Sequence, residues 1–254
     1  MTEYGLQLYS IRDISRDLPR ALCKVAAMGY RGVEFAGFFG YSASEVKAAL
    51  DAASLIAIGT HTSISELAKD RIYETIEYHK AIGCGHLTVP GANWSTLADM
   101  QRNIEMLREA APILRAEGIE LGYHNHSSEF FITPYGRTVE DEIIKSTDIN
   151  LEIDTFWLYN AGIDPVSYIE KHRDRIKLIH LKDGISRCGV GADFKNSFNG
   201  ARGRSLGKGD CPVKEIREAA LGYGIGMIVE SEDLAPTGLI EAERCIEYLR
   251  SLEF

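Results

Sequence analysis

The amino-acid sequence predicts an α/β fold, a single-domain (β/α)8 TIM barrel that spans residues 1–254. Eight short apolar runs have the composition of buried strands, and each is followed by a longer stretch with apolar residues three and four positions apart, as in helices. Eight such units fit a chain of 254 residues. No Pro- or Ser-rich linker divides the chain, so one domain is expected.

The expected strands lie along the whole chain and are largely apolar. They span residues 5–10, 32–36, 56–62, 86–91, 119–126, 149–157, 176–183 and 226–233. Apolar stretches of this kind favour a parallel sheet that is covered on both faces. The segments between them carry helical stripes, the first of which consists of Leu18, Ala21, Leu22, Val25 and Ala26. A doubly wound open sheet would usually have a glycine-rich turn after its first strand, but residues 9–13 contain no glycine.

One long connection, residues 184–212, follows the seventh strand and is expected to be irregular, with seven glycines. Loops of this length are usually functional lids or disordered segments. The loop has five basic side chains against two acidic ones. This local excess could close over a phosphate or carboxylate group, or it could belong to a solvated mobile loop.

Charge and cysteine content limit the function classes. The chain has 28 basic and 37 acidic side chains and a net charge of −9, which argues against a nucleic-acid partner. Its five cysteines have no CxxC spacing, which argues against a disulfide scaffold. The sequence has no signal-peptide pattern and no window of 18 uncharged apolar residues, so we expect a cytoplasmic location and no membrane partner. We expect a small-molecule substrate, and a homo-oligomer is compatible with the sequence.

Ionisable residues gather at the expected carboxyl ends of the strands, where barrels of this kind carry their chemistry. These residues include four histidines and several carboxylates: Glu34, His61, His124, His126, Glu129, Asp154, His180 and Glu230. Carboxylate oxygens mixed with imidazoles suit Mn, Co, Zn, Fe or Mg, and a cation would neutralise buried carboxylates. We therefore predict one divalent metal cation. In contrast, His79, His86 and His172 are expected to be structural, and Glu152 to be an interior or loop-anchoring residue without a role in chemistry.

Six motifs follow one another along the chain. They are Gly5-Leu-Gln-Leu-Tyr-Ser-Ile-Arg-Asp, Gly32-Val-Glu-Phe-Ala, Tyr123-His-Asn-His-Ser-Ser-Glu-Phe, Asp154-Thr-Phe-Trp, His180-Leu-Lys-Asp and Ile228-Val-Glu-Ser. In this order they resemble motifs of the sugar phosphate isomerase/epimerase family, the xylose isomerase-like barrels, over nearly the entire chain. The sequence is also similar to inosose dehydratases and to lyases and hydratases that act on 3-keto-glucosides.

The resemblance implies one divalent cation held by Glu, Asp, His and Glu from strands five to eight. Asp154, His180 and Glu230 match the last three ligands. Strand five departs from the pattern, because many members have a Glu followed two residues later by His, whereas this chain has His124 and His126. Either His124 replaces the carboxylate as a ligand, or Glu129 reaches the metal from just beyond the strand.

The activity implied is that of a metal-dependent sugar or keto-sugar isomerase or epimerase that abstracts a proton next to a carbonyl. A dehydratase, lyase or hydratase acting on a keto-sugar, a 3-keto-glucoside or an inosose is the alternative, because it shares this first step. Glu230 and His126 are the expected proton-transfer groups, and Lys182 is expected to contact a substrate oxygen. The expected substrate pocket contains Gln7, Glu34, His61 and Trp157, although Trp157 could equally be part of the aromatic core.

Two further classes remain as alternatives. An endonuclease for damaged DNA shares the barrel and a related metal centre, but the net charge and the lack of additional His and Asp ligands argue against it. A non-enzymatic carbohydrate-binding protein would bind sugar without depending on metal.

Overall fold

A computed structural model describes residues 3–253 and confirms the (β/α)8 TIM barrel. Eight parallel strands close into a barrel in the order β1-β10-β7-β6-β5-β4-β3-β2. Their bounds are β1 (Gly5–Gln7), β2 (Gly32–Phe35), β3 (Ile56–His61), β4 (His86–Val89), β5 (Glu120–His124), β6 (Asn150–Asp154), β7 (Ile176–Leu181) and β10 (Gly226–Val229). Each strand lies in one of the eight apolar runs of the sequence.

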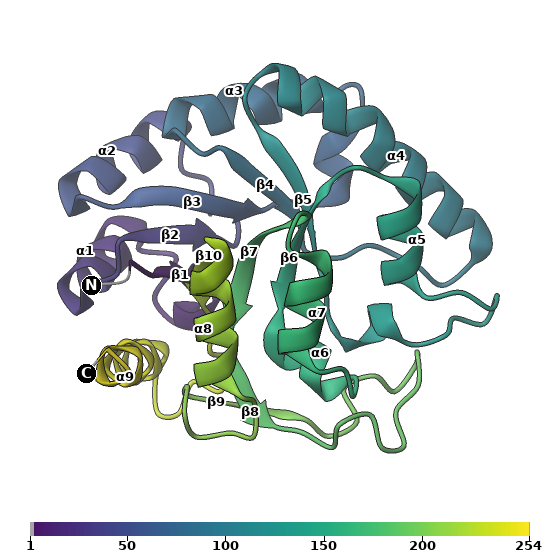
Figure 1. Ribbon diagram of the computed structural model, residues 1–254. Coiled ribbons are helices and arrows are strands. Elements are labelled where there is room, and N and C mark those ends of the chain that lie inside the picture. The colour runs from purple at the N-terminus through teal and green to yellow at the C-terminus, as the bar shows by residue number, and fades with distance from the viewer. Residues whose placement is uncertain (1–2, 254) are drawn as a thin grey trace.

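Helices cover the outside of the barrel, and Figure 1 shows several of them as an arc around the strands. The outer helices are α1 (Leu18–Met28), α2 (Ala43–Ala53), α3 (Ile72–Ile82), α4 (Leu97–Ala116), α5 (Val139–Ser146), α7 (Pro165–His172), α8 (Val213–Tyr223) and α9 (Gly238–Ser251). Their apolar faces pack on the strands; in α1 the buried side chains are Leu18, Ala21, Leu22 and Val25. Within residues 3–253 no helix has both the length and the apolar composition needed to cross a bilayer.

Several expected strands are too long at their carboxyl ends, because side chains there start helical turns. The Gln7 side chain accepts a hydrogen bond from the Tyr9 backbone and caps the 3-10 helix η1 (Leu8–Ile11). The Asp154 carboxylate caps α6 (Thr155–Asn160) by accepting from the Trp157 backbone, so residues 155–157 are helical. Two further 3-10 helices, η2 (Ile64–Leu67) and η3 (Ser127–Phe130), follow β3 and β5.

The segment 184–212 is only partly irregular, which corrects the sequence-based expectation. Strands β8 (Asp183–Ile185) and β9 (Arg202–Arg204) pair antiparallel and form a hairpin, seen at the bottom of Figure 1. The buried Asp183 carboxylate accepts hydrogen bonds from the backbone of Gly184, Gly209 and Cys211 and so ties the end of the segment to its start. A Cβ at Gly209 would lie 2.2 Å from Asp183 Oδ1, so the close approach requires glycine.

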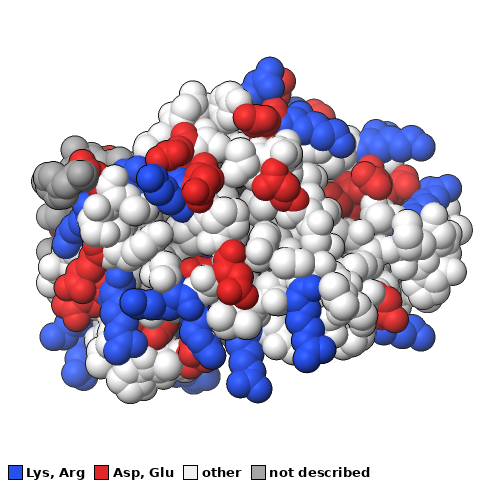
Figure 2. Space-filling model, turned by 60° about the horizontal axis from the view of Figure 1, so that its bottom comes forward, with Lys and Arg blue, Asp and Glu red and all other residues white. Residues whose placement is uncertain are grey.

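Acidic and basic side chains are interspersed on the face shown in Figure 2. In the basic segment after β7, Arg204 forms an ion pair of 3.0 Å with Asp233, which lies beyond β10. One of the five basic side chains of this segment is therefore already paired.

Candidate active site and metal centre

A cavity of about 380 Å³ lies at the carboxyl ends of the strands. Residues at or beyond the ends of six different strands line it, namely Tyr9, Ala36, Gly37, His61, Pro90, His124, His126, Glu230 and Glu232. This is the end of the barrel where such folds carry their chemistry. The lining includes three of the residues that the sequence analysis assigned to the site, His61, His126 and Glu230.

At this end of the barrel, four buried side chains come together as a possible metal centre. His124, Asp154, His180 and Glu230 each offer a ligand atom, and these atoms all lie within 4.8 Å of one another. The parallel register explains part of the grouping, because Asp154 pairs with His180 and Ile228 also pairs with His180. We call these four residues the upper ligand group.

The upper ligand group fits a divalent cation. Asp154 Oδ2 and His124 Nδ1 are buried and make no hydrogen bond within the described residues. Their charged neighbours are Lys182 Nζ, 3.5 Å from Asp154 Oδ2, and Glu152 Oε1, 3.2 Å from His124 Nδ1. Leaving a buried polar atom unpaired is costly, and bonds to a cation would remove that cost. Two carboxylates and two imidazoles are also a donor set that suits Mn, Co, Zn or Fe.

Lys182 lies under the cavity as the counter-charge of several carboxylates. Its side chain is buried, and Nζ lies 3.0 Å from Glu230 Oε2, 2.6 Å from Glu232 Oε2 and 3.5 Å from Asp154 Oδ2. Burial alone would lower the pKa of Lys182, but these carboxylates raise it above its ordinary value. The ammonium is thus enclosed by protein groups and contacts Glu230 and Glu232, two of the residues that line the cavity.

His180 lies between two sets of carboxylates. Its Nδ1 is 3.2 Å from Glu230 Oε2, whereas its Nε2 is 2.7 Å from Glu34 Oε2 and 3.1 Å from Glu152 Oε1. Gln7 Nε2 donates a hydrogen bond of 2.7 Å to Glu34 Oε2. Burial and the neighbouring Glu152 raise the pKa of Glu34 to about 7. Gln7 and Glu34 are fully buried, so they support the site from below and do not line the cavity.

Glu152 is an interior residue, as expected, but its contacts with the histidines of the site were not predicted from the sequence. Its Oε1 lies 2.8 Å from His61 Nε2 and 3.2 Å from His124 Nδ1, and Thr88 donates a hydrogen bond to Oε2. Burial would raise the pKa of Glu152, but the surrounding histidines hold it well below its ordinary value. Side chains alternate between the two faces of a strand, so residues 152 and 154 share a face, and this pattern could have indicated that Glu152 lies close to the site.

A second set of possible ligands overlaps the first, which the sequence did not lead us to expect. His61, His124, Glu152 and His180 also have ligand atoms within 4.8 Å of one another. In this lower set the Glu152 carboxylate already has partners in His61 and Thr88. Asp154, whose Oδ2 makes no hydrogen bond within the described residues, belongs only to the upper ligand group.

Glu129 does not belong to either ligand group. It lies in η3, where Oε1 accepts from the Tyr123 hydroxyl at 3.0 Å and Oε2 accepts from the His126 backbone and the Ser128 hydroxyl. These bonds use its carboxylate to shape the turn after β5. Of the two strand-five candidates, the structure therefore brings only His124 to the centre.

Trp157 packs beside the site as part of an aromatic wall. The Lys182 ammonium lies 4.7 Å from the centre of its ring, and Phe198 packs against it at 4.9 Å. Because Trp157 is nearly buried, it contributes more to enclosing Lys182 than to lining the cavity.

The barrel and its centre define a class of protein, a (β/α)8 barrel with converging histidines and carboxylates at the carboxyl ends of its strands. The family model of the xylose isomerase-like TIM barrel matches residues 22–252. The chain therefore belongs to the xylose isomerase-like TIM barrel family.

Relatives of the chain carry names of sugar-modifying enzymes. It is 28% identical over 145 residues to the inosose dehydratase of Salmonella agona (strain SL483), which is 53% of this chain and 47% of that protein. The chain thus spans about half the length of this relative. It is 24% identical over 248 residues to the inosose dehydratase of Halalkalibacterium halodurans, 85% of this chain and 80% of that protein. The crystal structure of a sugar phosphate isomerase/epimerase from Parabacteroides distasonis ATCC 8503 matches with a TM-score of 0.78 and 26% identity, covering 98% of this chain and 93% of that one.

Proposed function

We propose that this protein is a metal-dependent enzyme that isomerises or epimerises a sugar or keto-sugar by removing a proton next to a carbonyl. The observation that carries the proposal is the upper ligand group, which lies at the cavity and includes a buried carboxylate oxygen of Asp154 that makes no hydrogen bond within the described residues. The names of the relatives support a carbohydrate substrate.

A divalent cation would be held by His124, Asp154, His180 and Glu230. When bound, it supplies Lewis acidity that polarises the oxygens of a carbonyl substrate. The net negative charge of the carboxylates around Lys182 favours a divalent rather than a monovalent ion.

Glu230 and His126 are the side chains proposed to move protons. Both line the cavity, so they can reach a carbon of the bound sugar. Lys182 and His180 hold Glu230 Oε2 at 3.0 and 3.2 Å, which fixes the direction of its carboxylate. The His126 backbone is held by Glu129 at 3.0 Å, which fixes the start of η3. A base held in place before the substrate binds lowers the entropic cost of proton transfer.

Dehydration is a second candidate, favoured by a specific feature of this chain. Strand five presents His124 rather than a glutamate, so the site lacks the pair of glutamates that the family resemblance implies for epimerases. His126 on one side and Glu230 on the other can remove a proton and protonate a departing hydroxyl group. Two of the relatives are named inosose dehydratases, which supports this alternative.

The two reactions can be separated in deuterated water. Ketoses, inososes and 3-keto-glucosides are incubated with the Mn²⁺-loaded protein, and the products are analysed by NMR. Deuterium in an isomeric product supports isomerisation or epimerisation, whereas an unsaturated product supports dehydration. If no candidate exchanges its proton next to the carbonyl, the proposed chemistry is wrong.

A further inference from the structure

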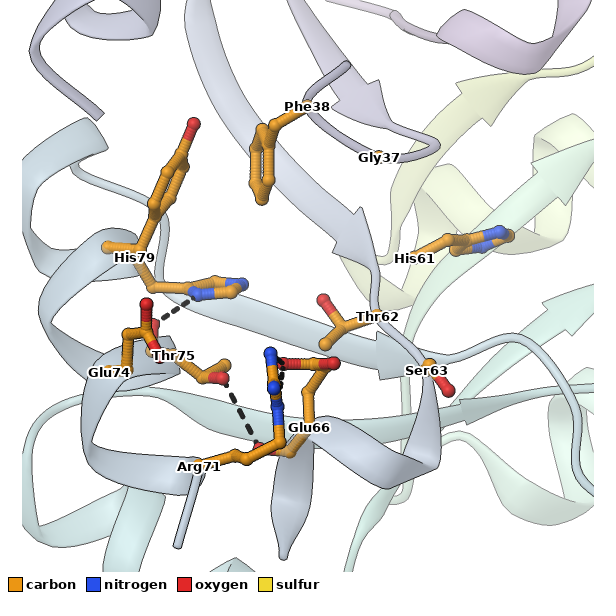
Figure 3. Close-up of a pocket in the computed structure, with 11 residues that line it drawn as sticks. Gly37, Phe38, His61, Thr62, Ser63, Glu66, Arg71, Glu74, Thr75 and His79 are labelled. Carbon is orange, nitrogen blue, oxygen red and sulfur yellow. Dashed lines mark hydrogen bonds and ion pairs between the residues drawn. The ribbon is translucent and has the colours of Figure 1, made fainter. Parts of the chain in front are cut away.

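A second pocket of about 250 Å³ adjoins the active-site cavity. The two share Gly37 and His61 in their linings, so they meet beside the end of β3. The second pocket extends from there between the loop after β2 and helix α3, as Figure 3 shows. His61 projects away from the other labelled side chains of this pocket, so its ring stands at the boundary.

One wall of the second pocket is aromatic. The rings of Phe38 and Tyr78 lie 4.2 Å apart at an angle of 34°. Tyr78 is held by a hydrogen bond of 2.7 Å from its hydroxyl to the Tyr41 carbonyl oxygen. Gly37, with φ +95°, has the left-handed backbone that turns the chain at Phe38. Figure 3 shows Phe38 extending into the pocket toward His79. Its ring also packs against Phe35 at 5.3 Å and is half-buried, so the part that remains exposed offers the pocket an apolar surface.

The base of the pocket presents a hydrogen-bond acceptor. His79 Nδ1 lies 2.7 Å from the Thr75 carbonyl oxygen, which can only accept, so Nδ1 carries the proton. Burial lowers the pKa of His79, so its ring is neutral and Nε2 accepts from the Thr60 hydroxyl at 2.7 Å. The Thr62 hydroxyl, 2.9 Å away, then donates to the Thr60 oxygen. Because the Thr62 hydroxyl donates its hydrogen to Thr60, the Thr62 oxygen can accept a hydrogen bond from a ligand.

The rim of the pocket is acidic on balance. Glu66, Glu74 and Arg71 line it, and Arg71 forms an ion pair of 2.8 Å with Glu66. The excess of one carboxylate would repel an anionic ligand, whereas a neutral ligand with several hydroxyl donors could bind there. An apolar face against an aromatic wall, combined with hydroxyl groups that donate to acceptors, describes a neutral sugar ring.

We propose that this second pocket, lined by Phe38, Thr62 and Tyr78, binds a second neutral sugar ring, so that the substrate is a disaccharide or glycoside whose reacting ring occupies the active-site cavity. The proposal rests on the proposed function, because it assigns the 380 Å³ cavity to the reacting sugar. Under this proposal, substrate specificity depends on the second sugar ring, which the proton-transfer groups in the active-site cavity do not contact.

The test is direct binding by calorimetry with D-glucose, sucrose, maltose, trehalose and cellobiose. At least one disaccharide is expected to bind more tightly than D-glucose to the wild-type protein. Phe38→Ala should weaken the binding of that disaccharide about 3- to 10-fold and leave the binding of D-glucose unchanged, because only the stacking surface of the second pocket is lost. Thr62→Val removes the acceptor at nearly constant volume and should act in the same direction. Tyr73→Ala is the matched control, because Tyr73 is exposed on α3 and lies outside the pocket.

The proposal is overturned if no disaccharide binds more tightly than D-glucose, or if Phe38→Ala and Thr62→Val weaken glucose and disaccharides equally. Thermal unfolding of each variant verifies that the fold is retained. The proposed chemistry is judged separately, by proton exchange in deuterated water. A disaccharide preference without exchange would therefore contradict the proposed function and leave the second pocket supported.

Discussion

His180 Nε2 lies 2.7 Å from Glu34 Oε2, and both side chains are completely buried. The pairing directs one ring nitrogen of His180 to Glu34 and leaves Nδ1 on the side of Glu230, 3.2 Å from its Oε2. A carboxylate that holds the far nitrogen of a metal-binding histidine fixes both the tautomer and the orientation of the ring. Glu34 is therefore a positioning residue for the proposed metal centre, and Gln7 holds Glu34 in turn.

Glu34→Gln is expected to weaken Mn²⁺ binding about 10- to 100-fold. The amide loses the negative charge that favours the Nε2–H tautomer of His180. The dissociation constant is measured by competition with a chelator of known affinity. Glu120→Gln is the matched control, because Glu120 lies at the start of β5, at the opposite end of that strand from His124. Equal affinity in wild type and Glu34→Gln would contradict the positioning role.

Gly59→Ala is expected to disrupt the same support from the neighbouring strand. A Cβ at Gly59 would lie 2.6 Å from Glu34 Oε1, so the carboxylate would have to shift, and its 2.7 Å contact with His180 through Oε2 would be disturbed. We expect a loss of Mn²⁺ affinity together with about 1 to 3 kcal/mol of stability. Gly85→Ala is the control, because its Cβ would make only ordinary contacts. Unfolding in urea and the chelator assay measure the two effects, and an unchanged Mn²⁺ affinity in Gly59→Ala would count against the account.

The barrel could be predicted from local patterns, but the deepest part of the site could not. Strand and helix periodicity are local, so the eight units are visible in the sequence. The expected lengths of β1 and β6 are too great at their carboxyl ends, because the side chains of Gln7 and Asp154 accept backbone hydrogen bonds and cap the helical turn that follows. The contacts of Glu152 with His61 and His124 could not be predicted, because these partners lie on β3 and β5 and the register between strands cannot be deduced from one sequence.

Lys182→Met is expected to lower turnover about 100-fold or more while Mn²⁺ still binds. The variant keeps the upper ligand group but removes the ammonium that holds Glu230 at 3.0 Å. Steady-state kinetics and metal content are measured on the same preparation. Lys47→Met is the control, because Lys47 pairs with Asp51 on the exposed face of α2. A rate within a few-fold of wild type would show that Glu230 does not depend on Lys182.

Glu140 makes stability depend on pH at a distance from the metal centre. Its carboxyl accepts from the Tyr168 hydroxyl, but burial raises its pKa to about 7. Folding therefore favours the protonated form, and the folded chain binds the proton more strongly than the unfolded chain. The free energy of unfolding should fall as the pH rises from about 4.5 to about 7, by up to about 3 kcal/mol, and this contribution should be constant above that range.

Glu140→Gln isolates this contribution, because the amide stays neutral at every pH. The stability of the variant relative to wild type should increase from pH 4.5 to pH 7 and then level off. Urea unfolding at several pH values measures the difference. A difference that does not change with pH would mean that Glu140 ionises normally in the folded protein.

The metal content of the purified protein shows whether the upper ligand group binds a cation. The wild-type chain is prepared without added metal, offered Mn²⁺ or Co²⁺, and analysed for bound metal together with Asp154→Ala, Glu230→Gln and Glu129→Gln. The account predicts about one cation per chain in wild type and in Glu129→Gln, and almost none in the other two variants. Almost no metal in the wild type, or full metal in Asp154→Ala, would contradict it.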